Sequence, residues 1–311
     1  MSAEARALST RAAELRISVK ASMLDAEPER LPWGTFRPSL PVRALIGVSR
    51  QTPLGRGILR KQLAQLLFLL HPGPVDARLW GHRVRLFPQH NVCERKALLR
   101  PDRMDPSELA FVRAQLSRPR PVFVDVGANA GLYSLYAALN AAAGARILAI
   151  EPDSALLARL QFNLALVFEA RAAAPDIEVA TAAVAVGARD GEGLLSVSGD
   201  EGSRSLLPGG AGRRVPLRRL AGLLAEHAIS EVTLMKIDVE GYEDQVLPPY
   251  LVEVPPERWP QSIIIEHVYR NRWSTDCIQL CEGCGYRVSA STNNNTLLER
   301  AHGSGIGNFS R

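Results

Sequence analysis

The feature that most constrains the fold is an alternation of short apolar runs with helical patterns, which begins near residue 122. Continuous apolar runs of this length are typical of parallel strands that are covered on both faces. Strands alternating with helices predict an α/β fold with a doubly wound sheet and right-handed crossovers. We expect strands at 122–127, 146–152, 177–184, 232–241, 262–268, 286–291 and 296–300, and helices at 131–143, 154–169 and 274–284.

The chain before this alternation predicts a helical and hairpin extension. Two alternating apolar runs at 76–88 flank Gly81-His82 and favour a hairpin. Asp105, Pro106 and Glu108 have the spacing of a capped helix start, in which Asp105 caps and Glu108 closes a capping box. We divide the chain into a weakly patterned, loosely attached or partly helical extension (1–73), a hairpin and capped helix (74–120), a ligand-binding domain (121–300) and a tail (301–311). A proline-rich stretch at 247–261 is interpreted as a wall of the site or a connector.

Composition excludes several classes of protein. The net charge is +5, but 33 of the 37 basic residues are arginines scattered along the chain. No cluster of basic residues interleaved with aromatic ones stands out, so nucleic acid is not an expected partner. No apolar stretch reaches the roughly 18 residues of a membrane-spanning helix, and a cytoplasmic location is expected. Residues 56–70 predict a helix docked on the main domain, with peripheral membrane contact as the alternative.

The first strand of the alternation ends in "VDVGANAG", at the edge where open sheets bind ligands. Gly127 and Gly131 let the backbone turn tightly before a helix N-terminus. The dinucleotide pattern G-x-G-x-x-G fails, because Asn129 and Leu132 occupy its second and third glycine positions. Asp125 would repel a pyrophosphate, whereas it suits a ligand with an ammonium group and a sulfonium. These charges describe S-adenosylmethionine.

Glu151 ends the second strand, where a carboxylate can accept hydrogen bonds from both ribose hydroxyls. Together with the glycine turn, it predicts a nucleoside-containing cofactor. The expected cofactor-binding residues are Asp125, Gly127, Asn129, Gly131, Glu151, Asp153 and Ala183.

The fourth strand carries charges that a central strand does not normally contain. Alternation places Lys236, Asp238 and Glu240 on one face. A buried lysine needs a carboxylate partner, for which Asp125, Asp238 and Glu266 are the candidates. These charged residues form either a structural network of ion pairs or a catalytic group. In the catalytic interpretation Asp238 is the first candidate for the base and His267 the second, with Lys236 beside them.

The acceptor side of the site is assigned to Glu240, Glu266, Ser203 and Ser205. The two serines lie in a glycine-rich stretch, 187–214, which either covers the site or is a surface insertion. Asp238 with Glu240 or Glu266 could hold a divalent metal, since paired carboxylates suit such ions. The sequence does not favour this alternative, and no metal is assigned.

Three cysteines at 277, 281 and 284 have the C-x3-C-x2-C spacing by which radical enzymes hold an iron–sulfur cluster. With Leu280 they also form the apolar stripe of the last predicted helix. In radical enzymes the motif comes early in the chain, and here it comes near the end. We therefore expect Cys277, Cys281 and Cys284 to pack in the core.

Several of these stretches together resemble the FkbM-type S-adenosylmethionine-dependent methyltransferases. They are "VFVDVGANAGLYSLYAA", "ILAIEPDSALLARLQFNLAL", "VAVGARDGEG", "LMKIDVEGYEDQVL" and "IIIEH", within roughly residues 105–300. The resemblance implies a Rossmann-like methyltransferase sheet and O-methylation of a small molecule or sugar. It also implies that Asp125, Gly127, Asn129, Gly131 and Glu151 line the cofactor. A nicotinamide-dependent oxidoreductase and a non-catalytic nucleoside-binding module remain the alternatives.

Overall fold

A seven-stranded sheet forms the centre of the molecule, seen here in a computed structural model that describes residues 27–52, 57–170, 176–196, 200–201, 204–207 and 212–300. The strand order is β12-β13-β11-β10-β3-β4-β5. The strands are β3 (Val122–Val126), β4 (Ala145–Ile150), β5 (Ile177–Ala182), β10 (Leu234–Ile237), β11 (Ser262–Glu266), β12 (Tyr286–Ser291) and β13 (Asn295–Arg300). The strands from β11 to β5 run parallel, and β13 lies antiparallel to β11. The predicted α/β, Rossmann-like doubly wound sheet is confirmed.

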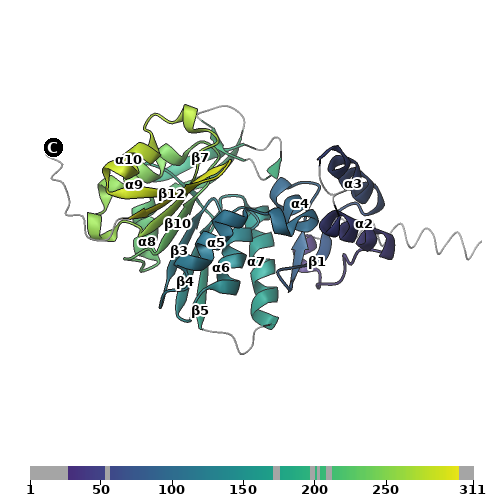
Figure 1. Ribbon diagram of the computed structural model, residues 1–311. Coiled ribbons are helices and arrows are strands. Elements are labelled where there is room, and N and C mark those ends of the chain that lie inside the picture. Colours follow the sequence, from purple (N-terminus) through teal and green to yellow (C-terminus); the bar gives the residue numbers. More distant parts are fainter. Residues whose placement is uncertain are drawn as a thin grey trace, which may run out of the picture.

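Helices cover both faces of this sheet (Figure 1). On one face lie α5 (Pro106–Gln115), α6 (Leu132–Asn140) and α7 (Ser154–Ala170), and on the other α8 (Leu220–Glu226), α9 (Leu247–Glu253) and α10 (Cys277–Gly283). Each face of the sheet has its own hydrophobic core. Successive side chains of a strand point to opposite faces, so Phe123 packs in the first core, under α5, α6 and α7, and Val124 packs in the second core, under α8, α9 and α10. Burial on both faces explains why the strands read as continuous apolar runs.

The N-terminal elements extend the first core beyond α7 (Figure 1). They are α2 (Leu40–Gln51), α3 (Gly57–Leu70), β1 (Val75–Leu79), β2 (His82–Leu86) and α4 (Val92–Leu99). The predicted hairpin is confirmed, with Trp80 and Gly81 at positive φ in its turn. Val42 and Ile46 are buried in the same core as Phe123. Of the two expectations for this extension, loosely attached or helical, α2 agrees with the helical one and packs in the core. Residues 1–26 and 301–311 lie outside the described residues.

Helix α3 keeps several leucines at the surface. Ala64 and Leu67 are buried, whereas Leu59, Leu66, Leu69 and Leu70 are exposed. Docking on the main body is confirmed through the two buried residues, and contact with a membrane surface stays a prediction. Among the described residues, no helix has both the length and the apolar character needed to cross a membrane.

The capping box predicted at Asp105 is wrong. Asp105 has a φ of 43° and makes no side-chain cap to α5. Its carboxylate instead accepts hydrogen bonds from Lys96 Nζ at 2.5 Å and from the Tyr133 hydroxyl at 3.1 Å. Glu108 is buried and accepts from the Asn295 amide at 3.0 Å. Partners distant in sequence thus replace the local ones that the spacing suggested.

A second, smaller sheet follows β5 and has the order β6-β9-β7-β8. Its strands are β6 (Ala185–Val186), β7 (Gly191–Leu195), β8 (Leu206–Leu207) and β9 (Arg213–Arg218). The connector expected at 247–261 contains a helix, α9, because Pro248 and Pro249 occupy its first turn, where proline is tolerated. The remaining short elements are 3-10 turns at Pro28–Arg30, Pro101–Arg103, Glu243–Gln245, Pro256–Arg258 and Arg270–Arg272.

The cysteines of α10 lie in the second core, as predicted. Cys277 and Cys281 are both fully buried there, and Cys284 packs against the same cluster. Burial raises the pKa of the Cys281 thiol to about 12, which keeps the sulfur protonated. The stripe of this helix therefore consists of packing residues.

Candidate active site

A cavity of about 360 Å³ opens at the carboxyl ends of β3, β4, β10 and β11. This is the edge where open parallel sheets bind ligands, and the order of the strands reverses there between β3 and β10. The cavity brings together eight of the residues singled out in the sequence: Gly127, Asn129, Glu151, Ser205, Lys236, Asp238, Glu240 and Glu266. The glycine-rich stretch also contributes Leu195 and Leu206, so its described part borders the cavity.

The glycine turn after β3 is held tightly against its neighbours. Gly127 has a φ of +78°, and a Cβ there would lie 1.9 Å from the carbonyl oxygen of Asp238. Gly131 has a φ of +79°, and its Cβ would lie 2.4 Å from Leu160 of α7. Asn129 between them is left-handed as well, at 54°. Glycine is required at 127 and 131 by close approach as well as by backbone angle.

Glu151 ends β4 at the floor of the cavity. Its two carboxylate oxygens accept hydrogen bonds from the backbone N–H groups of Asn129 and Asp153, each at 2.8 Å. Burial raises the pKa of Glu151 to about 8, against the opposing effect of the Asn129 hydrogen bond. A carboxylate oxygen can accept more than one hydrogen bond. Glu151 therefore retains capacity for two ligand hydroxyls, which is what a ribose presents.

Lys236 holds the neighbouring carboxylates in place. Its ammonium lies 2.8 Å from Asp238, 4.0 Å from Asp125 and 4.7 Å from the centre of the Tyr133 ring. Burial alone would lower the pKa of Lys236, but Asp238 and Asp125 outweigh it and the pKa is raised. Lys236 therefore stays charged and positions Asp238. It does not accept a proton.

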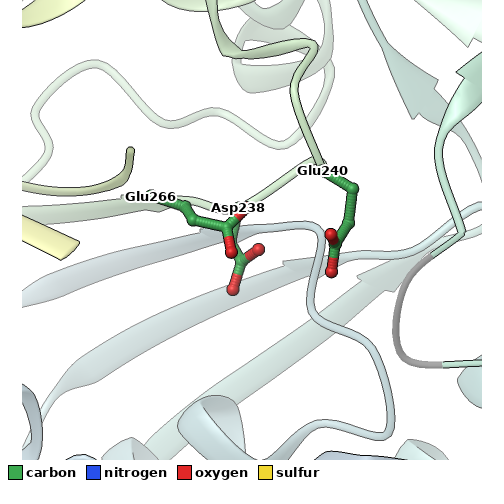
Figure 2. A group of neighbouring side chains, drawn as sticks. All are labelled: Asp238, Glu240 and Glu266. Carbon is green, nitrogen blue, oxygen red and sulfur yellow. The ribbon is translucent and has the colours of Figure 1, made fainter. Parts of the chain in front are cut away.

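Three carboxylates converge beside this lysine (Figure 2). Asp238 follows β10, Glu266 ends β11, and Glu240 reaches in from the loop after β10, with ligand oxygens within 4.8 Å of one another. Burial and repulsion from Asp238 raise the pKa of Glu240 to about 8 and that of Glu266 to about 10. We call Asp238, Glu240 and Glu266 the carboxylate cluster.

Apolar side chains form the opposite wall of the cavity. They come from α7, from the strands β6, β7 and β8 of the small sheet, and from the connection between β5 and β6. Its members are Leu156, Val184, Val186, Leu195 and Leu206. A cavity with an apolar wall and a few polar groups is typical of a small-molecule site. A flat aromatic ring is the kind of ligand group that such a wall accepts.

Some predicted site residues do not line the cavity. Asp125 lies below the turn and accepts a hydrogen bond from the Ser134 hydroxyl at 2.7 Å. Asp153 caps α7 and pairs with Arg204 and Arg213. The His267 ring contacts the Thr296 hydroxyl through Nδ1 at 2.8 Å, and its predicted catalytic role stays a prediction.

For two further predicted residues, Ala183 and Gly131, the neighbouring residues line the cavity. The position of a third, Ser203, is not described. Val184 and Ala185 line the cavity in place of Ala183, while Ala130 and Leu132 do so on either side of Gly131. Ser203 lies outside the described residues. Cofactor contact through these residues stays a prediction.

Other lining residues were missed in the sequence. Cys93 and Lys96 reach the cavity from α4, and Tyr133, Arg204 and Asn295 line it as well. Asn91 also caps α4 and donates a hydrogen bond to Asn129 at 2.6 Å, which ties α4 to the glycine turn. Asn91 directly before "VCE" is an N-cap signal that could have located α4.

Comparison with known proteins gives one family and one curated relative. A family described as "Methyltransferase FkbM domain" matches residues 125–288, more than half of the chain. The AMB antimetabolite synthetase AmbE from Pseudomonas aeruginosa is 32% identical over 167 residues. That match covers 42% of this chain and 8% of the synthetase, so the chain spans less than a tenth of that protein.

Solved structures with a similar arrangement are methyltransferases of low sequence identity. Precorrin-6y C5,15-methyltransferase from Geobacter metallireducens is 15% identical with a TM-score of 0.37, covering 62% of this chain and 87% of that one. The METTL16 methyltransferase domain is 12% identical with a TM-score of 0.39, covering 63% and 66%. Likeness at this level says nothing about substrates.

Proposed function

The chain belongs to the FkbM methyltransferase family, and on this premise we propose that it transfers a methyl group from S-adenosylmethionine to a hydroxyl of a small molecule or sugar. The observation that carries the proposal is Glu151, a buried carboxylate with hydrogen-bonding capacity on the wall of the cavity. Its position at the end of the strand next to the glycine turn suits a ribose.

The residues of the cavity fit this cofactor in chemical character. Glu151 would accept hydrogen bonds from the ribose hydroxyls, and the apolar wall with Val184 and Val186 would hold the adenine. When bound, S-adenosylmethionine supplies a methyl carbon activated by its sulfonium. The excess of carboxylates in the cavity favours a cationic ligand and disfavours a pyrophosphate, which argues against the nicotinamide alternative.

The carboxylate cluster is the proposed position of the acceptor hydroxyl. Asp238 is fixed by Lys236 at 2.8 Å and can orient the hydroxyl or take its proton. Ser205 lines the same cavity and offers a hydroxyl to a polar acceptor. The antimetabolite synthetase that shares this region supports an acceptor of low molecular mass. Polyhydroxylated small molecules, sugars among them, match this set of oxygens.

Calorimetry tests the proposal without knowledge of the acceptor. We expect S-adenosylmethionine to bind and NAD not to bind. Glu151→Ala should weaken S-adenosylmethionine binding by about 2–3 kcal/mol, because the hydrogen bonds to two ribose hydroxyls are lost. Glu257→Ala, at an exposed position outside the cavity, is the matched control and should bind normally. Binding of NAD in place of S-adenosylmethionine would refute the proposal, and an unchanged affinity in folded Glu151→Ala would remove Glu151 from the site.

A further inference from the structure

The carboxylate cluster contains one buried oxygen that the described residues leave without a hydrogen-bond donor. Glu266 is 9% exposed, and its buried Oε2 has no hydrogen-bond partner. Buried polar atoms are normally paired, so an orphaned carboxylate oxygen on a cavity wall points to a missing ligand. Lys236, the ammonium in contact with the cluster, is already taken up by Asp238 and Asp125.

A second orphaned oxygen lies beside Glu266. Asn295 of β13 is 6% exposed and faces Glu266 in the register of the two antiparallel strands. Its amide nitrogen donates to Glu108, while the buried Oδ1 has no hydrogen-bond partner. Both residues line the same cavity. This amide oxygen lies on a different strand from the three carboxylates, and it is a neutral oxygen of the kind that can bind a cation.

We propose that the carboxylate cluster, with the Asn295 amide oxygen beside it, binds a divalent cation such as Mg²⁺ or Mn²⁺. All the available ligands are oxygens, which these hard ions prefer. Carboxylates from two adjacent strand ends and one loop approach within 4.8 Å, close enough to share one ion (Figure 2).

The cation would also activate the acceptor hydroxyl. This part of the proposal rests on the proposed function, methyl transfer to a hydroxyl. An acceptor hydroxyl bound to the ion would lose its proton more readily, and that proton would leave to water. Asp238, as a ligand of the ion, would then orient the hydroxyl, which is the first of the two roles proposed for it above. The acceptor oxygen then forms its bond to the methyl carbon as the carbon–sulfur bond of S-adenosylmethionine breaks. The sulfur keeps the electron pair of that bond, and the products are the methyl ether and S-adenosylhomocysteine. Hydroxyl-bearing acceptors that can reach the ion are thereby selected.

Manganese titration followed by electron paramagnetic resonance tests the site directly. The full chain is stripped with EDTA and titrated with Mn²⁺. We expect one Mn²⁺ per chain, competed by Mg²⁺, and affinity more than about tenfold weaker in Glu240→Gln and Glu266→Gln. Glu257→Gln, which removes an exposed carboxylate elsewhere, should bind like the unmodified protein. No saturable binding, or equal binding by both cluster variants, would overturn the proposal.

Thermal melting separates loss of the site from loss of the fold. In EDTA, Glu240→Gln should melt no lower than the unmodified protein, because it removes a charge from a repelling cluster. Mg²⁺ should raise the melting temperature of the unmodified protein by more than that of the variant, because the variant binds the ion more weakly. If Glu266→Gln does not fold, Mn²⁺ binding by Glu240→Gln alone tests the cation proposal. Binding of S-adenosylmethionine with no Mn²⁺ site would end the cation proposal only, whereas a Mn²⁺ site without S-adenosylmethionine binding would end the proposed function only.

Discussion

Gly127 allows the turn after β3 to pack closely against the backbone of Asp238. A Cβ at this position would meet the Asp238 carbonyl oxygen at 1.9 Å, on a backbone with a φ of +78°. We predict that Gly127→Ala destabilises the protein by more than about 3 kcal/mol, since strain and overlap add. Gly81→Ala is the matched control, because its φ is +84° with nothing within 4 Å, and it should cost only about 1 kcal/mol. Urea denaturation compares the two, and equal losses would contradict the role of close approach.

At the same scale, Glu240 should make stability depend on pH. Burial and Asp238 raise its pKa from 4.5 to about 8 in the folded protein. Between these values the folded state holds more protons than the unfolded state, so this contribution to stability falls as pH rises from about 4.5 to 8. We predict that the melting temperature in EDTA falls less steeply over this window in Glu240→Gln than in the unmodified protein. Parallel curves for the two proteins would exclude the effect.

Among the elements, α10 allows a test of whether its cysteines serve packing. Cys281 is fully buried in the second core, whereas Cys284 is partly exposed. We predict that Cys281→Ser lowers the free energy of unfolding by about 1–3 kcal/mol, because a hydroxyl replaces a buried sulfur. Cys284→Ser should cost less than about 1 kcal/mol. Urea denaturation measures both, and iron in the purified protein would contradict the packing interpretation.

The elements also show what the sequence could and could not predict. The parallel strands were predictable because burial on both faces leaves continuous apolar runs, and Glu151 because it follows such a run. Helix α9 was missed because the prolines of its first turn resemble a connector. Tyr133, Asn295 and Lys96 reach the cavity through packing between elements distant in sequence. No local pattern encodes such contacts, and for the same reason Asp105 bonds to Lys96 and Tyr133 where a cap was expected.

At the scale of the whole molecule, one asparagine joins the N-terminal elements to the methyltransferase core. Asn163 of α7 accepts a hydrogen bond from the Arg85 backbone N–H at 2.7 Å and donates one to the Arg85 carbonyl at 3.1 Å. The Asn163 amide therefore pairs the backbone N–H and carbonyl of Arg85 in the way that the backbone of a neighbouring strand would. The Arg85 side chain is itself buried in a pair with Asp76. We therefore expect the N-terminal elements to unfold together with the sheet.

We predict that Asn163→Ala costs about 2–4 kcal/mol, because it leaves two buried backbone groups unpaired. Asn140→Ala, which removes only a bond to Tyr136 within α6, should cost about 1 kcal/mol or less. Urea unfolding followed by tryptophan fluorescence and by circular dichroism should give one coincident transition in the unmodified protein. Separate transitions for the two probes would show that the N-terminal elements unfold independently.

The left-handed backbone of Glu240, at a φ of 57°, would set activity against thermal stability if Glu240 has the role proposed for the carboxylate cluster. Glycine would relieve that strain, and it would also remove the carboxylate from the cluster. A laboratory screen that scores heat resistance alone should therefore enrich Glu240→Gly and similar changes and discard the site in doing so. Engineering this enzyme for durability will need a selection that scores turnover at the same time.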